Sequence, residues 1–263
     1  MTSSSQSQSS LSVRARIVFG ASAVLFGVIA LMWHDSETWQ TLKRLWSLPF
    51  GTITGACLMV AQIAGGIGIL FQRTARSASI VLGVVYLIFS LACIPGIFAA
   101  PDVYAAYGSF FEQFSLLCGA VAVYPATEPN RAQAAALVRL ARLGLGLCAI
   151  SFTLGQIFYL RFTATLVPTW LLPSQRFWAI LTTIAFALAA IAILINRQAR
   201  LALRLMALMT GLFGVLVWIP LLIAHPETHL NWSEFALTFL IAGAAWTVGE
   251  QTSLESMSQV FEV

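Results

Sequence analysis

Two copies of one pattern decide the fold: TLVPTWLLPS at Thr165–Ser174 followed by RQAR at Arg197–Arg200, and TLKRLWSLPF at Thr41–Phe50 followed by RTAR at Arg73–Arg76. The copies lie 124 residues apart, and in each copy 23 residues separate the last proline of the first motif from the first arginine of the second. A helix of that length, at about 1.5 Å per residue, crosses a hydrocarbon layer of about 30 Å. Each copy therefore predicts a loop on one side of a membrane, one spanning helix, and a basic turn on the other side.

The composition agrees with a membrane protein. Apolar residues make up 59% of the 263 residues and charged residues only 9%, whereas a soluble domain carries about 25% charged residues. Most of the chain is therefore expected to contact the lipid bilayer as its main partner. The net charge of +4 is explained by the distribution of arginines described below, so no nucleic-acid partner is predicted.

Apolar runs predict an all-α membrane protein of about eight transmembrane helices, arranged as two parallel four-helix repeats. The expected spans are about 17–33, 50–71, 77–98, 107–124, 143–160, 176–195, 205–224 and 233–249. The chain divides accordingly into a disordered cytoplasmic tail (1–13), the first repeat (14–124), a cytoplasmic linker (125–141), the second repeat (142–249) and a cytoplasmic tail (250–263).

Further pairs of residues extend the repeat. Gly20 and Gly144 lie 124 residues apart, and Pro95 and Pro220 lie 125 residues apart. Four spans in each repeat is an even number, so both repeats enter the membrane the same way up. Their pseudo-two-fold axis is then expected to run along the membrane normal.

The basic residues predict the orientation. With a cytoplasmic N-terminus, ten of the fourteen lie on the cytoplasmic side and four on the other, which is the positive-inside bias. We therefore expect a bacterial-type inner membrane protein with both termini in the cytoplasm. The ten are Arg14, Arg16, Arg73, Arg76, Arg131, Arg139, Arg142, Arg197, Arg200 and Arg204, and the four are Lys43, Arg44, Arg161 and Arg176.

Tryptophan is concentrated at the outer ends of the predicted spans. Seven of the eight tryptophans lie there, and either an aromatic belt or an aromatic-lined outer vestibule explains them. Because the predicted spans carry no clear charge at mid-depth, a ligand site between the repeats would use aromatic faces and neutral hydrogen-bonding groups. Trp46 and Trp170 from the outer loops, with Gln62 and Gln156 from the helices, are the candidates; Gln62, Tyr86, Gln156 and Tyr159 are alternatively interhelical hydrogen-bonding residues.

Glu112 and Glu234 occupy matching places near the starts of the fourth and eighth spans. A paired acidic site on the two-fold axis is one interpretation. The other is helix capping, because Ser109-x-x-Glu112 and Asn231-x-x-Glu234 have the spacing of a capping box.

No motif of a known catalytic or metal site is present, so the sequence gives no reason to expect an enzyme. Pro226 separates His225 from His229, which argues against a helical i,i+4 histidine pair and a metal site. The four cysteines form no C-x-x-C motif; buried structural roles and a redox pair are the two alternatives. They are Cys57, Cys93, Cys118 and Cys148.

Several of these motifs resemble the DoxX-like family of four-helix membrane proteins. The segment from Gln62 through Gly65-Gly66 to Arg73-Thr-Ala-Arg76 is similar to the family's second span, as is Leu194–Ala202 in the second half. The segment Val167–Pro173 is similar to the loop before that span. Two features depart from the family: Gln62 stands where the family has glutamate, with Phe186 as its repeat equivalent, and Lys43-Arg44 replaces Val-Pro.

The resemblance implies an accessory or quinone-linked component of a redox system. The cofactor stays open, with a quinone as one candidate, and a membrane or periplasmic redox protein is the candidate partner. A carrier or binder of a small apolar or lipid-like solute at the repeat interface is the alternative from a different class. A structural protein that binds other membrane proteins is the third.

Overall fold

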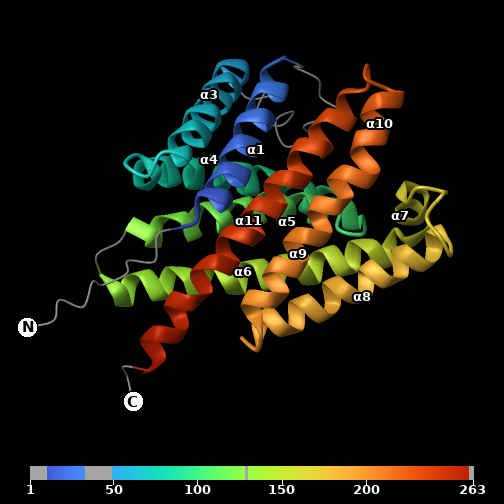
Figure 1. The fold of residues 1–263 in the computed structure, drawn as a ribbon. Helices are drawn as coiled ribbons and strands as arrows, with labels where there is room; N and C mark the ends of the chain where they lie inside the picture. Colours follow the sequence, from blue (N-terminus) through green and yellow to red (C-terminus); the bar gives the residue numbers. More distant parts are fainter. Residues whose placement is uncertain (1–10, 33–48, 128–129, 261–263) are drawn as a thin grey trace, which may run out of the picture.

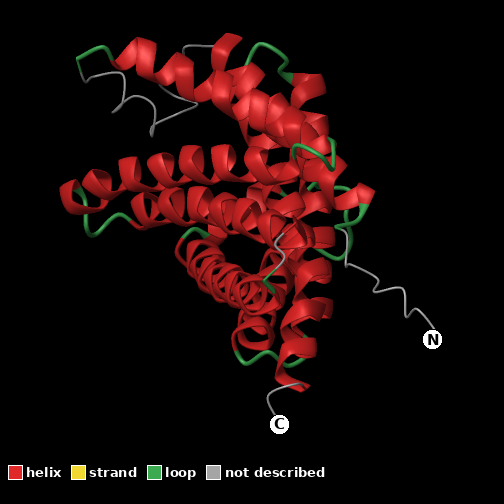
Figure 2. Cartoon of the chain, turned by 90° about the vertical axis from the view of Figure 1, so that its left-hand side faces the viewer, coloured by secondary structure: helices red, strands yellow, loops and turns green. Residues whose placement is uncertain are grey.

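The computed structural model describes residues 11–32, 49–127 and 130–260, with the backbone alone for 253–260. These residues form helices and loops only (Figure 2). The helices are α1 (Val13–Met32), α3 (Gly51–Leu70), α4 (Ala75–Ala99), α5 (Tyr104–Val123), α6 (Arg131–Phe158), α7 (Leu160–Leu166), α8 (Gln175–Leu194), α9 (Ala199–Phe213), α10 (Ile219–Ala224) and α11 (His229–Val260). A 3₁₀ turn (Tyr124–Thr127) follows α5, and a π-helical turn (Gly214–Trp218) joins α9 to α10.

Seven segments are long and apolar enough to cross a membrane, as the sequence predicts for an all-helical membrane protein. They are Val13–Met32, Gly51–Leu70, Ala75–Ala99, Tyr104–Ala126, Arg131–Phe158, Gln175–Leu194 and Ala199–Ala224. The eighth predicted span corresponds to α11, which is not among the seven over its described residues. Its polar residues Asn231, Glu234 and Glu250 lower its average hydropathy.

The position of α11 explains how it holds these polar residues. It runs through the middle of the molecule between α1 and the α9–α10 segment (Figure 1), and it contacts α1, α5, α6 and α9. Its residues from Leu240 to Ala245 are all buried. A helix surrounded by other helices presents little surface to lipid, so polar side chains are tolerated on it.

Helix α6 begins earlier than the sequence predicts. It runs without a break from Arg131, so most of the linker expected at 125–141 is helical. The reason is local: the Asn130 side chain caps the helix by accepting a 3.2 Å hydrogen bond from the backbone N–H of Gln133. Alanines at 132 and 134–136 then favour the helical conformation.

The glycine pair of α3 allows close packing on two sides. A Cβ on Gly66 would lie 2.8 Å from the Gly20 carbonyl oxygen of α1, and a Cβ on Gly65 would lie 2.8 Å from the Leu82 side chain of α4. Small residues at such contacts let helices in a membrane approach each other closely. The pair therefore holds α3 against both of its neighbours.

The first turn of α1 and the C-terminal part of α11 meet at one end of the molecule. The Glu250 carboxylate accepts hydrogen bonds from the Ser12 backbone N–H at 2.9 Å and from its hydroxyl at 2.6 Å. Glu250 also accepts a 2.7 Å bond from the indole N–H of Trp246. These contacts hold the residue that precedes α1 against the C-terminal part of α11.

Candidate functional site

Gln62 is fully buried on α3 and faces α1. Its side-chain NH₂ donates a 3.0 Å hydrogen bond to the Ala23 carbonyl oxygen, while its Oε1 atom has no partner among the described residues. The bond to Ala23 joins α3 to α1, so it is the interhelical hydrogen bond that the sequence predicts as one of two roles for Gln62.

Gln156 makes equivalent contacts between α6 and α8. Its Oε1 atom accepts hydrogen bonds from the hydroxyls of Thr183 at 2.9 Å and Thr182 at 3.3 Å. Because Gln62 joins α1 to α3 and Gln156 joins α6 to α8, each amide serves a different helix pair. The structure does not bring the two together.

Of the two candidate tryptophans, Trp46 lies outside the described residues. Trp170 lies in the loop between α7 and α8, with 67% of its surface exposed. Two other tryptophans form hydrogen bonds to loops. The indole N–H of Trp178 donates to the Leu172 carbonyl, and the indole N–H of Trp232 donates to the Pro226 carbonyl, both at 2.9 Å. A vestibule formed jointly by Trp46 and Trp170 stays a prediction.

The capping interpretation of Glu112 and Glu234 is wrong. Helix α5 begins at Tyr104 and α11 at His229, so both acids lie inside helices. The hydroxyl of Ser109 donates within α5 to the Ala105 carbonyl, and Asn231 donates to the loop carbonyls of Leu221 and His225. The capping spacing is misleading because α5 begins before Ser109 and α11 begins before Asn231.

Glu112 and Glu234 are instead electrostatic neighbours. Helices α5 and α11 contact each other, and the Glu234 carboxyl lies close enough to influence that of Glu112 electrostatically. Both side chains are half-buried. The paired acidic site on the two-fold axis stays a prediction.

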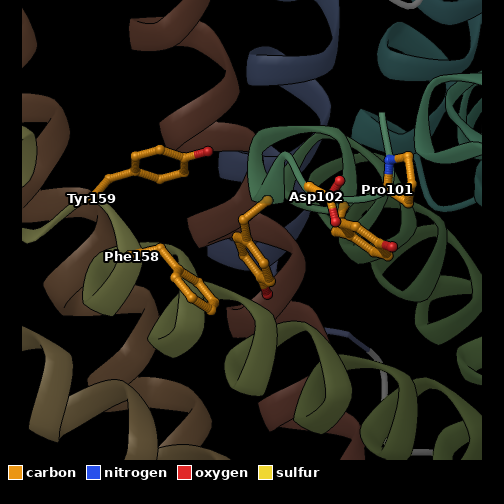
Figure 3. Close-up of a pocket in the computed structure, with 6 residues that line it drawn as sticks. Pro101, Asp102, Phe158 and Tyr159 are labelled. Atoms are coloured by element: carbon orange, nitrogen blue, oxygen red, sulfur yellow. The ribbon is translucent and has the colours of Figure 1, made fainter. Parts of the chain in front are cut away.

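A pocket of 320 Å³ opens where the α4–α5 connection meets the end of α6. Its lining residues are Pro101, Asp102, Tyr104, Tyr107, Phe158 and Tyr159. Figure 3 shows Phe158 and Tyr159 on one side of the pocket and Pro101 and Asp102 on the other. The volume lies at the lower end of the range for small-molecule sites.

Hydrogen bonds fix two of the tyrosine rings that line this pocket. The hydroxyl of Tyr104 donates to the Ser151 carbonyl at 3.0 Å and lies 2.9 Å from the Ser151 hydroxyl. The hydroxyl of Tyr159 accepts a 3.1 Å bond from the backbone N–H of Ala105, one of the first four N–H groups of α5, which lack helical partners. These two hydroxyls are engaged in the scaffold, so the rings that carry them are held in place at the pocket wall.

Ring contacts further order the aromatic wall. Tyr104 stacks on Tyr107 with centroids 5.9 Å apart, and its ring lies 5.0 Å from that of Phe158. Ring pairs at such distances stabilise each other beyond the area they bury. The wall is therefore largely organised before any ligand arrives.

Among the described residues that line the pocket, Asp102 is the one that carries a charge. Its side chain is exposed, and within the described part of the chain no cationic side chain forms an ion pair with it. The carboxylate is therefore available to a ligand.

Of the six site residues predicted from the sequence, the five that the structure describes do not line this pocket. For Tyr159, the sequence predicts only a polar group that forms an interhelical hydrogen bond or contacts a ligand. A usable signal was the i,i+3 spacing of Tyr104 and Tyr107, which places both on one helix face. Their proximity to Phe158 could not be read from the sequence, because the contact joins segments about 50 residues apart.

Two of the four cysteines meet between α5 and α6. Cys118 and Cys148 are both buried free thiols, and their side chains are neighbours. Cys118 also lies against Gly144, where no Cβ would fit. Both thiols therefore pack the contact between these helices.

No family model, curated protein or solved structure matches the chain. The class of protein consequently rests on the fold itself. Its long apolar helices define a multi-pass integral membrane protein in contact with the lipid bilayer.

Proposed function

We propose that the protein is an eight-span membrane protein of two four-helix repeats that binds a small solute in the pocket between the repeats. The binding role is supported by one observation: both repeats contribute residues to the wall of the pocket. Pro101–Tyr107 belongs to the first repeat, and Phe158 and Tyr159 belong to the second. Sites in tandem-repeat membrane proteins commonly form where the repeats meet.

The helix contacts support the repeat. α1 packs on α3 as α6 packs on α8, and α4 packs on α5 as α9 packs on α11. Between the repeats, α1 contacts α11 as α6 contacts α5, and α5 meets α11. Exchanging the two repeats returns each of these contacts, as a two-fold relation requires, while the contact of α6 with α11 has a much weaker counterpart between α1 and α5.

The π-helical turn also supports the repeat. Several buried positions of α4 have buried equivalents in α9 that lie 124 residues later in the sequence. Pro95 and its equivalent Pro220, farther along the same helices, are 125 residues apart. One residue must therefore have been inserted between these points in the second repeat. A π turn accommodates one extra residue within a helix, and the turn at Gly214–Trp218 contains the bond that shows it, from the Ile219 N–H to the Gly214 carbonyl. The corresponding buried pairs are Ala75 and Ala199, Ala78 and Ala202, Leu82 and Met206.

The proposed membrane is of the bacterial inner type, with both termini in the cytoplasm. The arginine distribution supports this orientation. The bonds from Ser12 to Glu250 support placing both ends on one side. The pocket then faces the outer surface, since it lies after the third span and at the end of the fifth.

A quinone-linked accessory role is the second candidate, and the DoxX-like motifs favour it. One feature of the pocket agrees with it. The Tyr107 hydroxyl has no hydrogen-bond partner among the described residues, so it is available to donate to a ring carbonyl of a bound quinone.

The binding role is tested by extraction. Protein purified in a maltoside detergent is extracted with organic solvent, and the extract is analysed by mass spectrometry and by oxidised-minus-reduced absorbance. We expect a solute that accompanies the wild type and is lost from Tyr107→Ala/Phe158→Ala. A quinone spectrum would select the second candidate.

The matched control is Phe162→Ala, which removes an exposed aromatic ring of α7 outside the pocket. It should retain the solute. The proposal fails if the pocket variant carries the same extracted solutes as the wild type.

A further inference from the structure

We infer that the pocket between the repeats takes an organic cation of the quaternary ammonium type, held by the aromatic wall and by Asp102. This inference rests on the proposed function and names the chemical class of its ligand. Four aromatic side chains and one carboxylate line a single concave site. Each of these two components attracts a cation for a separate physical reason.

The aromatic wall supplies the first attraction. The faces of tyrosine and phenylalanine rings carry negative electrostatic potential and attract cations within about 6 Å of the ring centre. Tyr104 and Tyr159 cannot turn freely because their hydroxyls are bonded to Ser151 and Ala105. A methylated ammonium group needs no hydrogen-bond acceptor, so it suits a wall whose two fixed hydroxyls are already engaged.

Asp102 supplies the second attraction, and its repeat equivalent shows why this position is distinctive. Glu227 lies 125 residues later, also directly after a proline. Its carboxylate lies 3.5 Å from the imidazole Nδ1 of His225, whereas Asp102 has no such neighbour among the described residues. Of the two matching acids, Asp102 is the one left to pair with an external cation.

The fit of the ligand follows from size and charge together. A pocket of 320 Å³ accommodates a head group of choline size and leaves the rest of a longer molecule outside. The neutral isostere 3,3-dimethyl-1-butanol has the same shape as choline without the charge. Comparing the two isolates the contribution of charge from that of shape.

The test measures choline binding by saturation-transfer NMR and calorimetry, with full-length protein in nanodiscs of phosphatidylglycerol. We expect choline to bind and its neutral isostere to bind at least about tenfold more weakly. Asp102→Asn and Tyr107→Leu should each weaken choline binding by about tenfold or more. Asp102→Glu should restore most of it, and Glu227→Gln should leave it unchanged.

Nanodiscs of phosphatidylcholine separate the two sources of such a cation. Loss of choline binding there means that the lipid head group occupies the site, and retained binding means that a free cation is the ligand. Both results support the inference.

Equal binding of choline and its isostere, with no effect of Asp102→Asn, would overturn the cation while leaving the pocket as a binding site. No binding of either probe would also overturn it, and the extraction experiment then decides separately whether the pocket binds any solute.

Discussion

Gly119 of α5 lies against Ala244 of α11 so closely that a Cβ on the glycine would come within 2.6 Å of the alanine Cβ. The two residues are 125 positions apart, the same offset that relates Pro95 to Pro220. In a two-fold arrangement such positions meet only where the axis passes between the helices. The contact therefore marks the centre of the proposed repeat.

The first prediction concerns this contact. Gly119→Ala should lower the melting temperature, because the added methyl group must displace backbone or Cβ atoms of α11. Overpacking typically costs about 1–3 kcal/mol, which exceeds the gain of up to about 1 kcal/mol in helix propensity. The measurement is thermal unfolding in detergent.

Gly108→Ala is the control on the same helix, because a Cβ there meets nothing within 4 Å. It should be neutral or slightly stabilising. Equal effects of the two substitutions would show that α5 and α11 do not pack as described.

The second prediction uses the π-helical turn. Deleting Leu216 removes the one extra residue and lets α9 continue as a regular α-helix, so Pro220 and the following residues keep their orientation. Deleting the matching residue Ala92 from α4 turns every later residue of that helix by about 100°. Folded yield by size-exclusion chromatography should therefore survive the first deletion and fall sharply after the second. Similar yields for both would contradict the assignment of the inserted residue.

Features of the fold that depend on residues close in the sequence can be predicted from it, whereas features that depend on contacts between distant segments cannot. Spanning helices follow from local hydropathy, so α3, α4 and α8 begin and end within a few residues of their predicted bounds. The start of α6 was missed because a capped, alanine-rich helix can extend beyond the membrane without apolar residues. The π turn was visible only as a change of offset from 124 to 125.

In the candidate site, too, local patterns can be predicted from the sequence and contacts between distant segments cannot. Glu112 and Glu234 lie 122 residues apart, so the repeat offset of 124 to 125 does not make them equivalent, and their spacing to Ser109 and Asn231 predicts capping instead. The pocket at Asp102 could not be predicted, because it depends on how the two repeats dock. No local pattern records that contact.

The third prediction concerns Gln62. Gln62→Leu removes the hydrogen bond to the Ala23 carbonyl, and interhelical bonds of this kind contribute about 0.6 kcal/mol on average. Gln62→Glu introduces the acid found in the resembling family, but a carboxylate cannot donate to that carbonyl. A charge inside a membrane costs about 2.5–3.5 kcal/mol. Thermal unfolding should therefore rank the glutamate variant below the leucine variant, and the reverse order would contradict the described contact.

The fourth prediction compares acids with and without partners. Glu112→Gln or Glu234→Gln should leave the melting temperature unchanged or raise it at neutral pH, because each replaces one of two neighbouring carboxyl groups, which are costly to charge away from water, by a neutral amide of similar shape. Glu250→Gln should lower it, because the Glu250 carboxylate accepts bonds from Ser12 and Trp246. A loss of stability in all three variants would indicate that the paired acids are bound to a cation or to another group.

The fifth prediction decides between seven and eight spans. Reporter fusions at Thr74, Asn130 and Gln198 should report the cytoplasm, and fusions at Gln40, Thr163 and Thr228 should report the outside. These six sites alternate in either case, so the deciding fusion is one placed after residue 260. If α11 spans the membrane, that reporter is cytoplasmic.

If α11 did not cross, the last reporter would lie outside. The Ser12 end of α1 and the Glu250 end of α11 are hydrogen-bonded to each other, so they must share one side of the membrane. An external reporter after residue 260 combined with a cytoplasmic one before residue 12 would therefore contradict both the eight-span proposal and this contact. A cytoplasmic result at both ends is the expected outcome, since a central helix shielded by α1, α5, α6 and α9 can cross without being strongly apolar.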